Sequence, residues 1–417
     1  MKKIAGRVFR WLTYFVLLLL GIEAILYFWA PVYDFPEPKP FSGDKFFNPY
    51  DGLDSTGWRK CNFHFHAREW WGLTAGRKNT ARELYRVYRK LLRYDAPQIS
   101  NYQSISTEFK DSAFYIPVYE HGFGLRKKHQ MLIGAKEVLW LDYSIVQNLN
   151  HKQHILNLLR PRSEIVAIAH PDWEEGYSLR DMKYLSNYDM LEVLDNNWRS
   201  LPQWDAALSS GHPAWILADD DAHNIEDPYQ IQRCATYIHS PVLQRDSIIR
   251  SLKSGRAYGV EIYMGNNWTF EQKAGWARRI PHLRYVRMAG DTLKVSVSGE
   301  VFKVMFIGQD GRIRKSVYSD TSLWYRFTPA DTYIRIVIVF IAHHTHPTIG
   351  MGDIFYLNPV FRYSGQFPVN DLKGEINWPR TWIFRFLTFG SLIAILWAIL
   401  HLKKSRKSRL TRHAIQP

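Results

Sequence analysis

The sequence predicts an α/β domain with a largely parallel sheet or barrel, followed by an all-β sandwich, with a transmembrane helix flanking the pair on each side. Three observations predict this fold class in a chain of 417 residues. Long apolar runs lie near both ends, short strands alternate with helical patterns over residues 59–258, and short alternating strands separated by turn residues fill residues 259–365. At about 150 residues per domain, the length suits two domains.

Charge and cysteine content argue against three classes of protein. The net charge is +15, but ten of the excess positive charges lie in residues 1–10 and 403–417, which contain no acidic residue. The middle of the chain is only mildly basic, so nucleic acid is not expected as a partner. Two cysteines are too few for a disulfide scaffold or a multi-cysteine metal cluster.

The first apolar run, residues 11–30, contains one charged residue, Glu23. It follows a short basic segment, residues 1–10, that is predicted to be cytoplasmic. At about 1.5 Å of rise per residue, a helix of this length crosses a hydrocarbon core of about 30 Å. A cleaved signal peptide would have a shorter apolar core and small residues at its cleavage site, whereas Tyr27, Phe28 and Trp29 are bulky. An uncleaved transmembrane anchor is therefore favoured.

The second apolar run, residues 382–402, precedes the basic tail 403–417. Basic residues flank both runs on their terminal sides, so the positive-inside rule places both termini in the cytoplasm. The chain is thus expected to be a two-pass protein of the cytoplasmic (inner) membrane, with its domains on the external, periplasmic side. The segments 31–58 and 366–381 are predicted to be linkers, the first opening with a proline-rich spacer.

The α/β region, residues 59–258, begins with the alternating run KCNFHFH, which is typical of a strand. Thr80 and Glu83 form a capping box that opens a helix with an apolar stripe. Further strands are expected at FYIPVY, QMLIGA, EIVAIA, MLEVL and AWILA, and helices at 144–160 and 242–253. Alternation of this kind indicates a largely parallel sheet or barrel with its chemistry at the C-terminal strand ends.

The sandwich region, residues 259–365, contains the runs TLKVSVSG, VFKVMFIG, SLWYRFTP and TYIRIVIVFIA, separated by turn residues.

Potential metal ligands gather at the ends of five of the predicted strands. They are His64 and His66, then Glu120, then His129, then His170, and finally Asp221 and His223 in the run ADDDAHN. Residues two apart on a strand share a face, so His64 and His66 can reach one ion. Imidazole suits Zn²⁺, Mn²⁺ or Fe, and a carboxylate can bridge two such ions.

Five ordered motifs carry a resemblance to a known family: NFHFHAREWWG, IPVYEHG, KHQMLIGA, EIVAIAHPDW and ADDDAHN. In this order and at these spacings the chain resembles the PHP (polymerase and histidinol phosphatase) superfamily over roughly residues 59–258. The resemblance implies a distorted (β/α)7 barrel with two or three metals and hydrolysis of phosphoesters. The segments SIIRSLKSGRAYG and IFYLNPVFRYSG resemble the C-terminal extension of some secreted or membrane-bound members.

Carried over by motif, the resemblance implies that one metal is bound by His64, His66 and Asp221, and that Glu120 bridges to a second metal held by His129 and His170. Two departures affect the third site: Trp71 precedes Gly72 where the family commonly has Asp or His, and Tyr102 replaces a His ligand. Since only His223 remains there, two divalent ions (Zn, Mn or Fe) are expected and a third site is doubtful.

The implied reaction is attack of a metal-bridging hydroxide on the phosphorus of a bound ester. Besides Glu120, two residues are assigned catalytic roles: Arg68 as a cation that stabilises negative charge, and His223 as the general acid. A surface ion pair is an equal alternative for Arg68. The predicted activity is therefore that of a membrane-anchored metal-dependent phosphoesterase acting on a phosphorylated small molecule, glycan or lipid head group.

Two other functions remain open. One is a non-catalytic envelope binding or scaffold protein with a degenerate barrel, and the other is a metal-dependent hydrolase of a non-phosphate ester or amide. Two structural questions also remain open. Cys61 and Cys234 could form a bridge, although two free buried thiols are favoured. The loop His343–His346 could contribute to the site, although an exposed loop is favoured.

Overall fold

The computed structural model of the chain describes residues 2–74, 76, 78–265, 267–318, 323–342, 350–365 and 373–413. The chain divides into two compact units, each formed by segments distant in sequence. The end unit comprises Met1–Asp34, Gln147–His154 and Gly374–Pro417, and the central unit comprises Phe35–Val146 and Ile155–Lys373.

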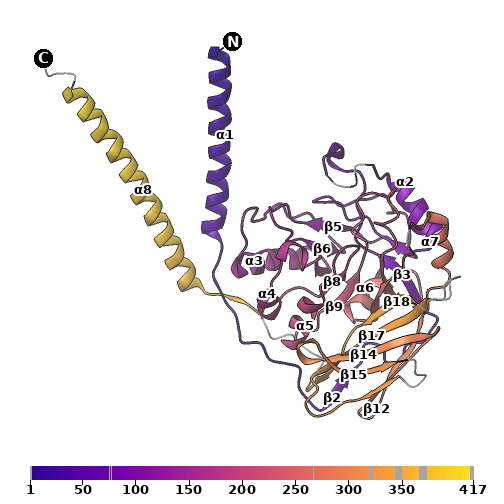
Figure 1. Cartoon of the computed structure of the whole chain (residues 1–417). Helices are drawn as coiled ribbons and strands as arrows, with labels where there is room; N and C mark the ends of the chain where they lie inside the picture. Colours follow the sequence, from indigo (N-terminus) through magenta and orange to yellow (C-terminus); the bar gives the residue numbers. More distant parts are fainter. Residues whose placement is uncertain are drawn as a thin grey trace. The chain divides into compact units, whose positions relative to one another are not determined.

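The structure is a mixed α/β fold with several sheets (Figure 1). The α-helices are α1 (Lys2–Trp29), α2 (Ala81–Leu84), α3 (Leu149–Leu159), α4 (Leu179–Tyr184), α5 (Leu201–Ser209), α6 (Arg245–Lys253), α7 (Phe270–Trp276) and α8 (Trp378–His413). The capping box at Thr80 and Glu83 is confirmed, and α2 continues directly into a π-helical stretch, Tyr85–Leu91. The helices expected at 144–160 and 242–253 are present as the shorter α3 and α6.

One sheet of the central unit has the strand order β5-β6-β7-β8-β9. Its strands are β5 (Val118–His121), β6 (Gln130–Ile133), β7 (Ile165–Ile168), β8 (Met190–Leu194) and β9 (Trp215–Ala218), and every residue of these strands is buried. The expectation of a largely parallel sheet is only partly right. β7, β8 and β9 are parallel, but β5-β6 and β6-β7 are antiparallel, because β5 and β6 are joined by a short loop without a helical crossover.

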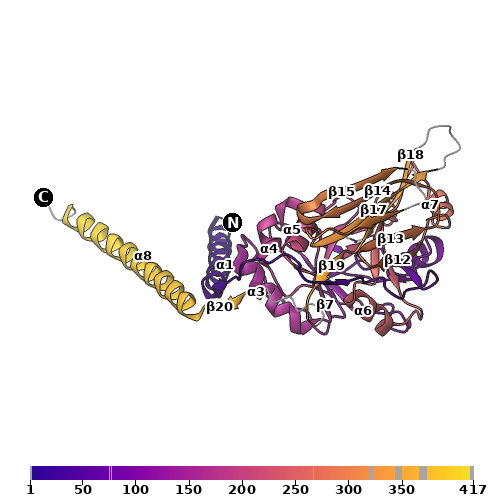
Figure 2. The ribbon, with the colours of Figure 1, turned by 90° about the horizontal axis from the view of Figure 1, so that it is seen from below.

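A larger sheet of the central unit has the order β15-β14-β17-β18-β11-β10-β3-β4, with β19 and β2 attached beside β17. These strands are β2 (Lys45–Phe47), β3 (Trp58–Asn62), β4 (Ala96–Pro97), β10 (Cys234–His239), β11 (Ala257–Glu261), β14 (Val301–Gly308), β15 (Arg312–Tyr318), β17 (Tyr333–Ala342), β18 (Gly350–Leu357) and β19 (Val360–Tyr363). Figure 2 shows β14, β15 and β17 side by side, as their hydrogen bonds require.

This sheet runs through the position expected for the domain boundary. β11 contains residues 258 and 259, and it pairs with β10 on one side and with β18 on the other. A single hydrophobic core includes Phe65 and Tyr88 from the first region together with Phe306 and Ile338 from the second. The two predicted regions therefore share a sheet and a core.

The region expected to be all-β also contains a helix. α7 also begins at a capping box, in which Thr269 and Gln272 exchange hydrogen bonds, so the helix has a local signal that strand patterning overlooks. A small sheet follows, with the order β12-β13-β16, formed by β12 (Leu283–Ala289), β13 (Thr292–Val297) and β16 (Trp324–Arg326).

In the end unit, β1 (Tyr33–Asp34) pairs with β20 (Glu375–Ile376), joining the segments that follow α1 and precede α8. Arg385 donates to the carbonyl of Trp29 at 2.6 Å, and its guanidinium lies over the Trp29 ring. Arg385 is thus buried between the two helices rather than extended toward solvent.

One helix of the described chain is long and apolar enough to cross a membrane: 24 residues of α1, Gly6–Trp29, without a buried residue in its apolar window. The second predicted span, 382–402, is helical within α8, but α8 does not meet the same criterion over its described residues. The two-pass topology therefore stays a prediction.

Candidate metal centre

The predicted ligands come from separate elements that meet at one edge of the two large sheets. β3 ends at Asn62, so His64 and His66 lie just beyond the strand rather than on it, in an extended segment that bridges to Ala222 through Phe65. Glu120 is within β5, and His129 immediately precedes β6. Because β5 and β6 are antiparallel, with His121 opposite Gln130, the start of β6 lies beside the end of β5.

The remaining two ligands follow the parallel strands. His170 comes two residues after β7, and Asp221 three residues after β9. Both have a positive φ, 26° for His170 and 45° for Asp221, which L-residues with side chains rarely adopt. Such backbone strain is typical of residues that the surrounding fold holds in place for a function.

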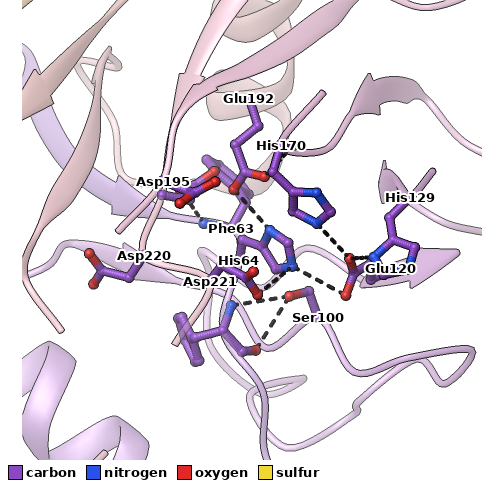
Figure 3. Close-up of polar contacts among 12 residues, drawn as sticks. Phe63, His64, Ser100, Glu120, His129, His170, Glu192, Asp195, Asp220 and Asp221 are labelled. Atoms are coloured by element: carbon purple, nitrogen blue, oxygen red, sulfur yellow. Dashed lines mark hydrogen bonds and ion pairs between the residues drawn. The ribbon is translucent and has the colours of Figure 1, made fainter. Parts of the chain in front are cut away.

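The first group of donors is His64, His66, Glu120 and Asp221, all of them buried. Figure 3 shows three of them, His64, Glu120 and Asp221. The Nε2 atom of His64 lies 3.3 Å from Glu120 Oε2 and 3.1 Å from Asp221 Oδ1. The Nε2 atom of His66 lies 3.3 Å and 3.2 Å from the same two oxygens. Four donor atoms therefore face a common point.

The second group shares Glu120 with the first. Its other carboxylate oxygen, Oε1, lies 2.5 Å from His129 Nδ1 and 3.2 Å from His170 Nε2. Figure 3 shows His129 and His170 with their rings directed at the Glu120 carboxylate. Gly122 allows His129 to approach, because a Cβ at this residue would lie 2.7 Å from the His129 ring.

The bonding of these atoms fits a bound cation. His64 Nε2, Glu120 Oε2 and His129 Nδ1 are buried, and none of their close contacts has the geometry of a hydrogen bond. Burying polar atoms in this way is costly. Burial alone would lower the pKa of His64, yet Asp221, Glu192 and Glu120 raise it well above its usual range. Positive charge would therefore stabilise the cluster, and divalent ions bound by His and carboxylate ligands would supply it.

Glu192 on β8 is a functional candidate that sequence reasoning missed. Its Oε1 accepts from His64 Nδ1 at 2.9 Å, and its Oε2 accepts from the His170 backbone N–H at 2.9 Å. A hydrogen bond at Nδ1 leaves the lone pair of His64 on Nε2, the atom that faces the first group. The available signal was a charged residue in the middle of the otherwise apolar run MLEVL.

The three consecutive acids after β9 have different environments. Asp219 accepts from the Phe63 backbone N–H, and its other oxygen is buried without a partner. Asp220 accepts from Tyr88 Oη and from the backbone N–H groups of residues 232–234. Only Asp221 of the three belongs to a donor group, so Asp220 is a structural residue that holds the loop after β9.

His223 and Tyr102 lie beside the first group, and neither belongs to a donor group among the described residues. The Tyr102 ring stacks on His66 with 4.5 Å between ring centroids, and the Tyr102 hydroxyl lies 3.4 Å from His223 Nε2. The other ring nitrogen of His223 is 2.7 Å from the Asp221 carbonyl oxygen. Burial lowers the pKa of His223 and raises that of Tyr102 well above its usual range.

A cavity of about 820 Å³ opens beside the donor groups. Its lining residues include His129, His223 and Tyr102 from the centre, and aromatic and polar side chains that sequence reasoning did not select: Trp70, Thr74, Gln103, Phe123, Lys127, Trp140 and Trp173. Arg68 is exposed and is not among the described lining residues, whereas Lys127 is. The Lys127 ammonium lies 4.9 Å from the centroid of the Trp173 ring.

Two further expectations concern residues outside this centre. Cys61 and Cys234 are both buried and free, and burial raises the pKa of each thiol well above its usual range, which disfavours the reactive thiolate. The loop His343–His346 lies outside the described residues.

Comparisons with known proteins found a distant structural similarity. No protein-family model matches the chain, and no curated protein sequence matches it. A solved structure from Bacteroides vulgatus, described as a two-domain protein containing a predicted PHP-like metal-dependent phosphoesterase, is similar to this chain. The similarity covers 76% of this chain and 100% of that chain, at 13% sequence identity and a TM-score of 0.38.

Proposed function

We propose that the chain is a membrane-anchored, metal-dependent phosphoesterase that binds two divalent ions (Zn, Mn or Fe). The observation that carries this proposal is the position of Glu120, whose two carboxylate oxygens face two different sets of histidines. A carboxylate so placed can join two ions, and paired ions act on the oxygens of a phosphoester.

The first ion would be held by His64, His66 and Asp221, and the second by His129 and His170, with Glu120 between them. Ions held there would lower the pKa of a bound water, and their positive charge would stabilise the oxygens of the phosphate. Glu192 orients the His64 ring and the backbone of His170 through its two oxygens. It is therefore a positioning residue for both sets.

Two residues at the cavity wall complete the proposed reaction. Lys127 lines the cavity and offers an ammonium group to a bound phosphate, the role that sequence reasoning gave to Arg68. His223 also lines the cavity, with Nδ1 facing the Asp221 carbonyl oxygen and Nε2 facing the Tyr102 hydroxyl. It is the candidate donor of a proton to the leaving oxygen, and it gives that proton from its doubly protonated form.

We further propose a distorted (β/α)7 barrel over residues 59–258 and a two-pass topology with the catalytic domain on the external side. Isolated parallel bridges, Phe65–Ala222 and Tyr102–Glu120, link strand ends of the two large sheets and support closure. The pairing of β1 with β20 supports the topology, because it joins the inner ends of α1 and α8.

The test compares the full-length protein with its Glu120→Gln variant, both purified without chelator. The variant is expected to lose bound metal and phosphoesterase activity together, because the amide carries no charge to bridge two ions. Metal content by mass spectrometry and hydrolysis of a phosphoester panel measure both. The matched control is Glu137→Gln, since Glu137 is largely exposed in a surface ion pair with Arg162.

The same experiment distinguishes the alternatives. If the protein binds metal and hydrolyses carboxylate esters or amides but no phosphoester, the result would favour a metal-dependent hydrolase of a non-phosphate bond. A wild-type protein that binds neither Zn²⁺, Mn²⁺ nor Fe²⁺ would contradict the proposal and favour a binding or scaffold role. Activity retained in Glu120→Gln would show that the site is assigned wrongly.

A further inference from the structure

The cavity beside the metal centre has a mainly apolar lining. Aromatic rings form most of its wall, contributed by Trp70, Phe123, Trp140 and Trp173. Among the described lining residues there is no carboxylate and no asparagine. Sugars and nucleobases can stack on such rings, but their recognition also needs several hydrogen bonds, and most of this wall is apolar.

The wall also contains polar groups, some of them from the metal centre. His129 and His223 belong to or border the donor groups, and Lys127 is the cation among the described lining residues. Gln103 is 6% exposed, and neither its Nε2 nor its Oε1 has a hydrogen-bond partner. A buried amide without a partner is costly unless a ligand satisfies it.

Several exposed apolar side chains are lining residues or their neighbours in sequence. We use the name apolar rim for five exposed side chains on the lining loops or next to a lining residue: Trp71, Leu73, Phe123, Leu125 and Trp140. Leu73 is 84% exposed and Leu125 is 77% exposed. Trp70 packs edge-to-face on Trp140 at 5.8 Å, which joins two of the loops that carry the rim.

Exposed apolar patches next to a cavity mark binding sites. The aliphatic side chains of the apolar rim indicate which class of ligand binds here. A sugar stacks on aromatic rings, but Leu73 and Leu125 gain nothing from a polar ring and are stabilised by contact with a hydrocarbon chain. The apolar helix Gly6–Trp29 is long enough to anchor the chain in a membrane, where such chains are abundant.

We propose that the substrate is a lipid phosphate, whose phosphate binds at the metal centre while its hydrocarbon chain occupies the aromatic cavity and leaves across the apolar rim. This inference rests on the proposed phosphoesterase function. In the reaction a water oxygen bonds to phosphorus and the bond from phosphorus to the alkoxy oxygen breaks. That oxygen takes one proton, and the products are inorganic phosphate and a long-chain alcohol.

The test uses the full-length, metal-loaded protein held in an amphipathic polymer, because detergent chains would compete for the cavity. The substrates are methyl, butyl, octyl and dodecyl phosphate, which share the reacting group and differ in chain length. We expect kcat/KM to rise about 100-fold along the series, since each buried methylene adds binding energy. Glucose 6-phosphate and a nucleoside monophosphate complete the panel.

The double variant Leu73→Ser/Leu125→Ser tests the apolar rim. The ratio of kcat/KM for dodecyl over methyl phosphate is expected to fall about tenfold, because part of the apolar contact is lost. Ile313→Ser is the matched control, since Ile313 is an exposed apolar residue of β15 outside the cavity lining. Trp140→Ser is a second variant if the first does not fold, and bound metal reports folding.

A binding measurement separates failure of this inference from failure of the proposed function. Calorimetry compares dodecylphosphonate with methylphosphonate, which are not hydrolysed. Hydrolysis with no chain-length dependence, or with preference for the sugar or nucleotide, would overturn the lipid assignment and keep the phosphoesterase. A third result is no hydrolysis, together with tighter binding of dodecylphosphonate than of methylphosphonate and weaker dodecylphosphonate binding in the rim variants. It would support the lipid phosphate as the ligand and overturn the reaction.

Two remaining results both overturn the lipid assignment. One is the absence of chain-dependent hydrolysis and of chain-dependent binding. The other is a rim variant that lowers turnover only when substrates are presented in phosphatidylcholine vesicles, which would show that the apolar rim contacts the membrane surface instead of the substrate.

Discussion

Glu120 shows how much of the candidate chemistry depends on single atoms. Its Oε2 faces His64 and His66, and its Oε1 faces His129 and His170. Burial alone would raise the pKa of this carboxyl, but the His129 and His64 imidazoles hold it well below its usual range. The residue is therefore a carboxylate at neutral pH, as a bridging ligand must be.

Glu192 gives a prediction at the same scale. Glu192→Gln keeps the shape of the side chain and weakens the charge-assisted hydrogen bond to His64 Nδ1. We expect the affinity for divalent metal to fall about 10–100-fold, as happens when the outer partner of a ligating histidine is replaced. Metal titration against a chelator measures it, with Glu137→Gln as the control. An unchanged affinity would exclude a positioning role for Glu192.

His212 predicts how stability responds to pH. Burial lowers its pKa to about 4, and the ring stacks on Tyr188 while Nε2 donates to the Tyr188 carbonyl. In the unfolded chain its pKa is about 6.5. The unfolded state therefore binds more protons between these values, so this contribution to stability is complete above pH of about 6.5 and is lost as pH falls toward 4.

We expect lowering the pH from about 7.5 to about 5 to remove about 2 kcal/mol of unfolding free energy through His212. The measurement is urea unfolding of the full chain in mild detergent at both pH values, compared with His212→Asn. The variant should lose less stability on acidification than the wild type. Equal losses in the two proteins would contradict the assignment.

At the scale of elements, α5 is joined to the sandwich strands by a buried ion pair. Arg335 of β17 donates to both oxygens of Asp205 on α5, at 2.7 Å and 2.6 Å, and Tyr333 donates to the same carboxylate at 3.2 Å. The paired side chains are 3% and 12% exposed. This contact ties a helix of the α/β region to a strand of the following region.

Asp205→Ala is expected to destabilise the protein by about 3–5 kcal/mol, because it leaves the Arg335 charge buried without a partner. Urea unfolding of the full chain measures the loss. Asp291→Ala removes the partner of Arg326 in an exposed pair and should change stability little, because solvent screens that pair. Similar effects of the two substitutions would show that the Asp205–Arg335 pair has no special role.

At the scale of the whole molecule, the distribution of charge predicts topology. The basic segments at both ends hold ten positive charges without an acid, and the apolar runs lie directly inside them. We therefore expect residues between the runs to be external and both termini to be cytoplasmic.

Cysteine labelling tests this topology. Cys61 and Cys234 are buried, so single introduced cysteines can be read against a low background. Ser55→Cys, at an exposed position, should react with a membrane-impermeant maleimide in right-side-out vesicles, whereas Ser408→Cys in the basic tail should react only after permeabilisation. Labelling of Ser408→Cys in sealed vesicles would contradict the two-pass topology.

Local patterns in the sequence determined most of the elements and the identity of the clustered side chains. The capping box at Thr80 and the apolar runs of β7, β8 and β9 are signals carried by neighbouring residues, so they can be read without a fold. The structure brings together six of the predicted ligands, His64, His66, Glu120, His129, His170 and Asp221, and leaves His223 outside both groups. Their role as metal ligands stays a prediction.

Only the tertiary structure decided what depends on residues distant in sequence. Strand direction in β5 and β6, the continuity of one sheet through β11, and the burial of Asp220 by backbone donors follow from packing, which periodicity does not encode. Glu192, Lys127 and the aromatic cavity were missed for the same reason. The role of a side chain depends on the groups that surround it in space. For these residues the surrounding groups come from other elements of the fold.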